Sequence, residues 1–228
     1  MARQISTGKC NLCGGAFDKA AMTKHLKSCS QTKPESAASD RRPGRQKTKT
    51  FHFVVEGRYS PGYWMHLEAP ANATLEILDG FLRQTWLECC GHMSAFTIED
   101  KTYSVAPTAE FDDEGMDAKL GDVLQPGMKF YHEYDFGTTT HLALKVISEQ
   151  ESDIKVRDIR VLARNEPPPI PCGSCGKAAT RVCTECLWSD TGKGWLCDAC
   201  AAKHKRHEEM FLPVVNSPRV GMCGYTGQ

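Results

Sequence analysis

The sequence lacks any long apolar run. No stretch approaches the roughly 18 apolar residues that a membrane helix needs, and the first residues lack the apolar core of a signal peptide. We therefore expect a protein of the cytoplasm, which is a reducing compartment. In such a compartment, twelve cysteines that include CxxC pairs followed by histidines indicate metal binding rather than a disulfide scaffold.

Two short segments have the composition of boundaries between domains. Residues 31–50 contain none larger than alanine and cannot bury enough surface to offset ordering entropy, so we expect a flexible basic linker. The run EPPPIP at 166–171 favours an extended spacer. These boundaries predict a small module at 1–30, a central domain at 51–165, and a second module with a tail at 172–228.

The net charge is zero, but the charges are unevenly distributed. Residues 1–50 carry 11 Lys/Arg against 3 Asp/Glu, whereas residues 51–165 carry 10 against 19. A basic end is a reason to consider nucleic acid as a partner there, although basic tails are also simply solvated.

The central segment has the pattern of an α+β domain. FHFVVEG and YWMHLEA, separated by a Ser-Pro-Gly turn, predict a hairpin. A helix that packs on the sheet should follow, with Thr74 as its N-cap. Its apolar positions are Leu75, Leu78, Leu82, Trp86 and Leu87. Later runs, among them MKFYHEYDF and HLALKVISE, predict further strands. We therefore expect a central antiparallel sheet with a packed helix, flanked by small zinc-binding modules.

The first candidate zinc site lies in CNLCGGAFDKAAMTKHLKSC. The spacing places two cysteines on a tight turn and a histidine and a cysteine four residues apart on a short helix, and zinc takes four such ligands in a tetrahedron. The segment resembles a zinc finger in which the last histidine is replaced by cysteine. The ligand candidates are Cys10, Cys13, His25 and Cys29.

The C-terminal module contains eight further ligand candidates, enough for two tetrahedral zinc ions and about three ions in the whole chain. They are Cys172, Cys175, Cys183, Cys186, Cys197, Cys200, His204 and His207. Sequential pairing joins the first four and then the last four, and a helix that starts near Asp198 would favour it. Interleaved pairing joins the first and third CxxC pairs on one zinc and the remaining four ligands on the other, and it resembles the cross-brace of RING and B-box domains. We slightly favour interleaving.

Three cysteines fall outside these spacings. Cys89 and Cys90 are adjacent, which makes a poor chelate even with His92 nearby, so we expect them to pack at a helix end. Cys223 could replace His207 as a ligand, but a free or buried thiol is the simpler interpretation.

The stretch YHEYDFGTTTHLALKV, together with Pro61 and Trp64 in the early hairpin and the run LEILDGFLRQTWLECCGHMSAF, resembles the plasmid pRiA4b ORF-three-like family over residues 51–150. The resemblance implies an α+β domain of prokaryotic proteins that are often linked to plasmids and mobile elements. It indicates a fold more than a function. The signature residues are Tyr134, Asp135, Phe136, Gly137 and His141, whereas Thr138 and Thr140 depart from the family pattern.

Nucleic-acid binding is the first functional hypothesis. Its basic candidates are Lys19, Lys24, Lys27, Arg41, Arg42, Arg45, Lys47 and Lys49, which could neutralise several phosphates. The alternative is a protein-interaction scaffold without catalysis, in which the basic segment is only a solvated tail. The oligomeric state is left open.

An enzyme is the third hypothesis and the least favoured. Glu133, Asp135, His141 and His92 could supply acid–base groups if the fold brought them together. Asp135 is more simply a turn residue that caps backbone N–H groups, and His141 a strand residue. The zinc sites are ligand-saturated, and a catalytic zinc needs an open position.

Overall fold

The computed structural model describes residues 6–32, 47–108, 110, 112–155, 157–189 and 192–227. Contacts divide the chain into two compact units. The first unit is formed by Met1–Phe81 and Met93–Glu166, and the second by Leu82–His92 and Pro167–Gln228. Among the described residues, no helix is both long and apolar enough to cross a membrane.

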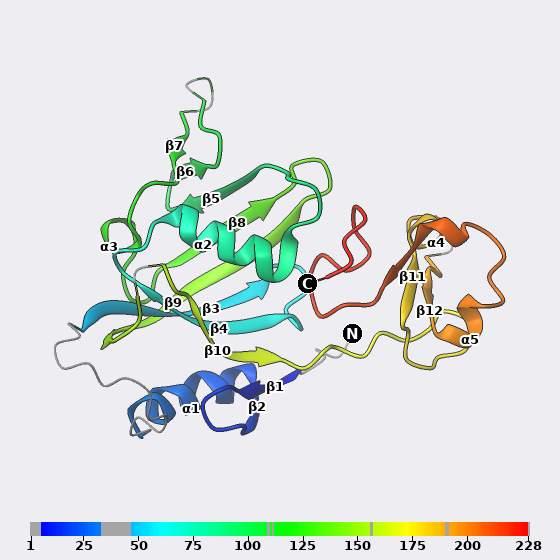
Figure 1. Ribbon diagram of the computed structural model, residues 1–228, viewed down its shortest axis with the longest axis horizontal. Helices are drawn as coiled ribbons and strands as arrows, with labels where there is room; N and C mark the ends of the chain where they lie inside the picture. The colour runs from blue at the N-terminus through cyan, green and yellow to red at the C-terminus, as the bar shows by residue number, and fades with distance from the viewer. Residues whose placement is uncertain are drawn as a thin grey trace. The chain divides into compact units, whose positions relative to one another are not determined.

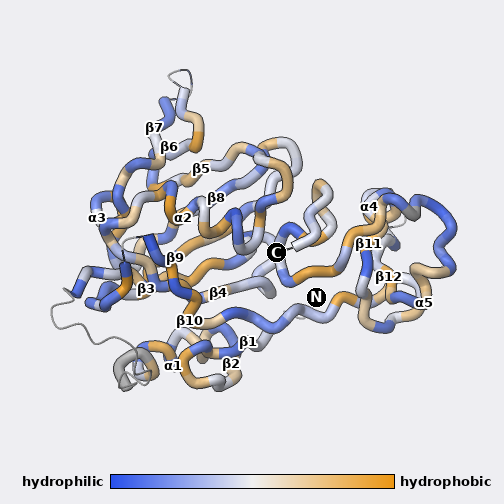
Figure 2. The backbone as a smooth tube through the Cα atoms, in the orientation of Figure 1, coloured by the Kyte–Doolittle hydropathy of each residue, from blue (hydrophilic) through white to orange (hydrophobic). Residues whose placement is uncertain are grey.

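The first unit is built on one large sheet, which confirms the predicted α+β class (Figure 1). The strand order is β2-β1-β10-β4-β3-β9-β8-β5-β6-β7, and every pair is antiparallel except β6–β7. The strands are β1 Thr7–Cys10, β2 Ala16–Asp18, β3 Thr48–Gly57, β4 Trp64–Pro70, β5 Ser94–Ile98, β6 Lys101–Ser104, β7 Glu114–Gly115, β8 Lys129–Tyr134, β9 Thr140–Ser152 and β10 Arg160–Asn165. The helices are α1 Lys19–Thr32, α2 Leu75–Leu82 and α3 Leu120–Val123. In Figure 2, hydrophobic residues run along the central strands.

The predicted central helix is present, with its cap. The backbone N–H of Ile77 donates to Thr74 Oγ1 at 3.3 Å, and all five predicted apolar positions are fully buried. The α-helix ends at Leu82 and continues as the π-helical turn η1 Arg83–Leu87. A buried pair, His132 Nε2 and Asp79 Oδ1 at 2.7 Å, joins α2 to β8. The helix therefore packs on the sheet as expected.

The start of the sheet differs from the expectation. Thr48 to Thr50, which the sequence assigns to the linker, are the first residues of β3, and Thr48 pairs with Ser152 of β9. Pairing with a long neighbouring strand satisfies their backbone groups despite their polar side chains. The predicted linker residues 33–46 lie outside the described residues.

The N-terminal module is built into the sheet. Strand β1 pairs with β10, a strand that the sequence analysis missed because RVLARN is half polar, and Gly8 lies opposite Asn165. Met22 and Leu26 of α1 share a buried cluster with Trp64 of β4. The Trp64 indole N–H also donates to Ser6 Oγ at 2.7 Å. Figure 1 shows α1 beside β1 and β2 at this end of the sheet.

The second unit contains a three-stranded sheet in the order β12-β11-β13. Its strands are β11 Arg181–Cys183, β12 Trp195–Leu196 and β13 Phe211–Pro213, and its short helices are α4 Thr184–Leu187, α5 Asp198–Ala201 and the 3-10 turn η2 Glu208–Met210. Its buried residues include a cluster of Cys172, Leu196 and Cys197 and, outside that cluster, Val182 and Tyr225.

We predict that Gly8→Ala destabilises the first unit by about 1–3 kcal/mol. A Cβ at Gly8 would lie 2.3 Å from the Arg164 carbonyl oxygen and 2.6 Å from the Trp64 ring, and neither backbone nor a buried indole can yield easily. Urea unfolding of zinc-replete protein measures the effect. Gly80→Ala in α2 is the control, because a Cβ there meets nothing within 4 Å and should stabilise the helix by about 0.5–1 kcal/mol. Equal behaviour of the two variants would contradict the close docking of β1.

We also predict a loss of stability in mild acid from two buried histidines. His52 Nε2 lies 2.9 Å from His66 Nδ1. Burial, with a smaller effect of the Lys27 charge, lowers the pKa of His52 to about 4, and burial lowers the pKa of His66 to about 3. Both folded-state pKa values lie below the unfolded value of about 6.5, so protons bind the unfolded chain first as the pH falls. Stability is therefore unaffected above pH 6.5 and decreases between about pH 6.5 and pH 3–4.

Unfolding free energies at pH 7 and pH 5 test this effect. The wild-type chain should lose about 4 kcal/mol more than a H52N/H66N variant over this interval, because each histidine contributes about 1.4 kcal/mol per pH unit below pH 6.5. Acid protonation of cysteine and histidine ligands affects both proteins alike. Parallel pH profiles would show that the histidine pair is not the cause.

Candidate metal centres

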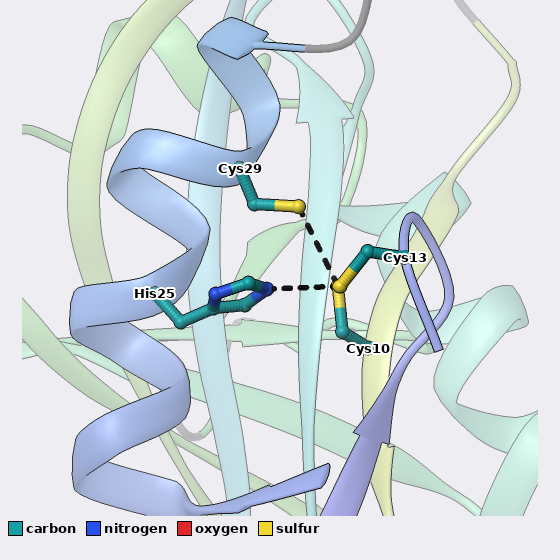
Figure 3. A group of neighbouring side chains, drawn as sticks. All are labelled: Cys10, Cys13, His25 and Cys29. Atoms are coloured by element: carbon teal, nitrogen blue, oxygen red, sulfur yellow. Dashed lines mark hydrogen bonds between the residues drawn. The ribbon is translucent and has the colours of Figure 1, made fainter. Parts of the chain in front are cut away.

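The four N-terminal ligand candidates converge in the structure. We call Cys10, Cys13, His25 and Cys29 the N-terminal cluster, and their ligand atoms all lie within 4.8 Å of one another (Figure 3). The turn between β1 and β2 positions the first two: the N–H of Gly14 donates to the Cys10 carbonyl at 2.8 Å, and Gly14 has a φ of 78° that favours glycine. Helix α1 supplies the other two. Phe17 stacks on the His25 ring at 4.2 Å and fixes its orientation.

The distances within the N-terminal cluster fit a shared metal ion. Around zinc, Zn–S and Zn–N bonds of about 2.3 and 2.05 Å place two sulfurs about 3.8 Å apart and a sulfur about 3.6 Å from a nitrogen. Cys10 Sγ lies 4.0 Å from Cys29 Sγ, and Cys13 Sγ lies 3.2 Å from His25 Nε2. A disulfide would need about 2.05 Å.

The C-terminal ligand candidates form two groups in the interleaved arrangement. The four-cysteine cluster contains Cys172, Cys175, Cys197 and Cys200, and the mixed cluster contains Cys183, Cys186, His204 and His207. Cys175 Sγ lies 3.6 Å from Cys197 Sγ, and Cys186 Sγ lies 3.5 Å from His204 Nε2. Sequential pairing is therefore wrong for this structure.

Short elements explain why interleaving prevails. Helix α5 begins at Asp198, as the sequence predicts, but ends at Ala201, so the two histidines never share its face with Cys200. The N–H of Gly173 donates to the Trp195 carbonyl at 2.8 Å, which places the first CxxC turn beside the third. Strand β13 pairs with β11 and brings the histidine segment to the second CxxC turn.

Electrostatics within these clusters favour a cation. A hydrogen bond from the Cys197 backbone lowers the pKa of Cys172 to about 6, whereas contact with the Cys175 side chain raises the pKa of Cys200 to about 12. Burial raises the pKa of Cys29 in the N-terminal cluster to about 11. Thiolates gathered this closely repel one another, and a divalent cation among them would stabilise all of them together. The described cysteines are all free of disulfides.

The basic residues proposed to contact nucleic acid differ in exposure and in their carboxylate partners. Lys24, Lys27 and Lys47 are exposed. Lys19 pairs with Glu56, and Lys49 Nζ lies 2.8 Å from Glu149 Oε2, so both already have a carboxylate partner. The predicted residues Arg41, Arg42 and Arg45 lie outside the described residues.

The family-signature residues have structural roles at the turn after β8. Asp135 is buried at a positive φ of 66°, and its Oδ1 accepts the N–H groups of Gly137 and Thr138 at 3.1 and 3.2 Å. This confirms the turn-capping interpretation. His141 lies in β9, as expected, with its Nδ1 2.9 Å from Glu133 Oε1. Tyr134 is buried and Phe136 is 55% exposed.

Sequence analysis missed a fourth group of ligand atoms. Cys89, Cys90, His92 and Cys223, which we call the tail cluster, also converge within 4.8 Å. We expected Cys89 and Cys90 to pack at a helix end and Cys223 to be a separate thiol. That expectation is wrong, because the three thiols lie together with His92. The only sequence signal was the short spacing CCGH, because Cys223 lies 131 residues beyond His92.

Comparisons with known proteins add little. No family model matches the chain, and no curated protein matches it. Among solved structures, the chain is similar to MM3350, a protein of unknown function from Methanosarcina mazei Go1. That similarity has a TM-score of 0.45 and 16% identity over 52% of this chain and 70% of the other. It is too weak to support an inference, and the resemblance to the pRiA4b ORF-three-like family stays a prediction.

We predict that Cys186→Ser removes the metal ion of the mixed cluster and leaves the four-cysteine cluster loaded. Cys175→Ser should do the reverse, because interleaved clusters share no ligand. Metal content by mass spectrometry, with cobalt spectra of the cysteine-rich site, measures both outcomes. If either variant instead released the ions of both clusters while the module stayed folded, independent interleaved sites would be ruled out.

Proposed function

We propose that the protein is a recognition protein whose small modules are stabilised by structural zinc, about three ions in the predicted clusters. The observation that carries this proposal is the convergence of four ligand atoms within 4.8 Å in each cluster. Cysteine and histidine are the ligands that zinc takes in closed structural sites. Four protein ligands leave no open position for a substrate or water, so this coordination supports a structural rather than a catalytic role.

We propose nucleic acid as the partner of the N-terminal module. Its support is the excess of 11 Lys/Arg over 3 Asp/Glu in residues 1–50 and the two exposed lysines of α1, Lys24 and Lys27, which lie one turn apart. Helix α1 shares a buried cluster with Trp64 and Leu162 of the sheet, so the sheet fixes the position of the helix that carries these lysines. The ion-paired Lys19 and Lys49 would contribute less, since a phosphate must compete with a carboxylate.

The resemblance of the central domain to the pRiA4b ORF-three-like family belongs to the same proposal. It supports a role in proteins linked to plasmids or mobile elements, where nucleic acid is an available partner. The domain itself would serve as the platform that holds the N-terminal module.

A protein-interaction scaffold is the second candidate. Its support is Trp188, which is 66% exposed just after α4 of the second unit. Tryptophan is enriched where proteins bind one another, because it buries a large area at low entropic cost.

We predict that K24E/K27E weakens binding of labelled DNA or RNA by the full-length, zinc-loaded chain. The slope of log affinity against log salt should become less steep by about 2, because each phosphate contact contributes about 0.7–0.9 to the slope. Fluorescence anisotropy across a salt series measures the slope.

The matched control is K129E/K145E. It changes the net charge by the same amount at two exposed lysines that face each other on β8 and β9. An equal loss in both variants would mean that only net charge matters and would contradict a site on α1. If the wild-type chain binds no nucleic acid at low salt while Trp188→Ala abolishes capture of a protein partner, the scaffold is the better function.

A further inference from the structure

The tail cluster has the geometry of a metal site, although the proposed function does not use it. Cys90 Sγ lies 3.4 Å from Cys89 Sγ and 3.8 Å from Cys223 Sγ. His92 Nε2 lies 3.0 Å from Cys90 Sγ and 3.2 Å from Cys223 Sγ. One sulfur–sulfur distance equals the roughly 3.8 Å edge of a tetrahedron around zinc and the other is slightly shorter, and both are much too long for disulfides.

The chain after η1 is arranged so that adjacent cysteines can both turn inward. Glu88 accepts the N–H of Gly91 at 2.6 Å, and its other oxygen accepts from Arg83 at 2.7 Å. Gly91 has a φ of 78°, which bends the chain sharply between Cys90 and His92. Adjacent cysteines in an extended chain point to opposite sides and chelate poorly. This bend allows both thiols to face the same point.

The C-terminal tail is held against this segment by buried polar contacts within the second unit. Ser217 Oγ donates to the Trp86 carbonyl at 2.6 Å and accepts the N–H of Arg219 at 2.9 Å. Tyr225 is 2% exposed. Between these anchors, Cys223 has a φ of 44°, in the left-handed region that costs a non-glycine residue about 1–3 kcal/mol. The anchors on both sides hold the Cys223 thiol beside the other three ligands.

The charge of the surroundings suits a loaded site. Arg219 is fully buried, and its Nη2 donates to Cys89 Sγ at 3.4 Å. Three thiolates and one neutral imidazole around a divalent cation leave one net negative charge. The buried guanidinium beside Cys89 has the sign that complements this charge.

We propose that a fourth zinc ion binds here, with the ligands Cys89, Cys90, His92 and Cys223. It fastens the C-terminal tail to the segment that follows η1 and makes a cross-link between parts of the chain 131 residues apart. Two of its ligands are exposed and none is buried, unlike the other three clusters, each of which has at least one buried ligand. This ion should therefore be the first to leave when a chelator is added.

Full-length protein loaded with ¹¹³Cd tests the site, because the cadmium chemical shift separates ligand sets by their number of sulfurs. The four clusters predict one signal from four sulfurs, two from three sulfurs and a nitrogen, and one from two of each. Cys223→Ser should remove one of the two three-sulfur signals, and Cys13→Ser should remove the other. Met93→Ala, beside His92 but not a ligand, should keep all four signals. His92→Gln is a second variant of the tail cluster in case Cys223→Ser does not fold.

The outcomes separate this proposal from the proposed function. Three signals in the wild type, unchanged in Cys223→Ser and His92→Gln, overturn the tail site and leave the predicted clusters intact. A Cys90–Cys223 disulfide in freshly purified protein also overturns it. A single three-sulfur signal that is lost in Cys223→Ser and kept in Cys13→Ser supports the tail site while contradicting the N-terminal one.

Discussion

The constraint on which the small modules depend is the convergence of cysteine and histidine side chains that arrive from separate segments. In the second unit the helices α4 and α5 have four residues each and the strands two or three, too short to be stable alone. The unit buries some further side chains, among them Val182 and Tyr225. Thiolates gathered this closely repel one another, and a divalent cation among them would relieve that repulsion. Under the proposal of structural zinc, metal binding and folding of this unit are one process.

The N-terminal cluster differs from those of the second unit because its module is attached to the large sheet. Its β1 strand extends the large sheet through β10, and its helix buries Met22 and Leu26 against Trp64. Zinc there would fix the local turn and the position of His25, while the sheet carries the module as a whole. This matters for recognition, because a single finger on a flexible tether orders itself only on binding, whereas a docked helix loses little entropy when it meets a partner.

The acid–base candidates named from the sequence have defined surroundings in the structure. Asp135 is used to cap a turn, and His141 pairs with Glu133 on neighbouring strands. His92 belongs to the tail cluster with three cysteines. Each of these acid–base candidates therefore has a polar partner or lies among cysteines. The described surface carries exposed lysines on α1 and an exposed tryptophan after α4.

Elements whose signals lie close together in the chain can be predicted from the residues alone. Strand alternation, the helix of Leu75 and Leu78, and the ligands of three clusters could be predicted, because periodicity and CxxC spacing depend on near neighbours. Features that depend on contacts between distant segments can be seen only in the folded chain. Strand β10 forms because β1 and β4 pair with it on either side. The ligands of the second unit are interleaved because α5 ends at Ala201. Cys223 lies 3.2 Å from His92, which is 131 residues earlier in the chain. Residue spacing cannot predict this contact between Cys223 and His92, because the path of the whole chain brings the two residues together.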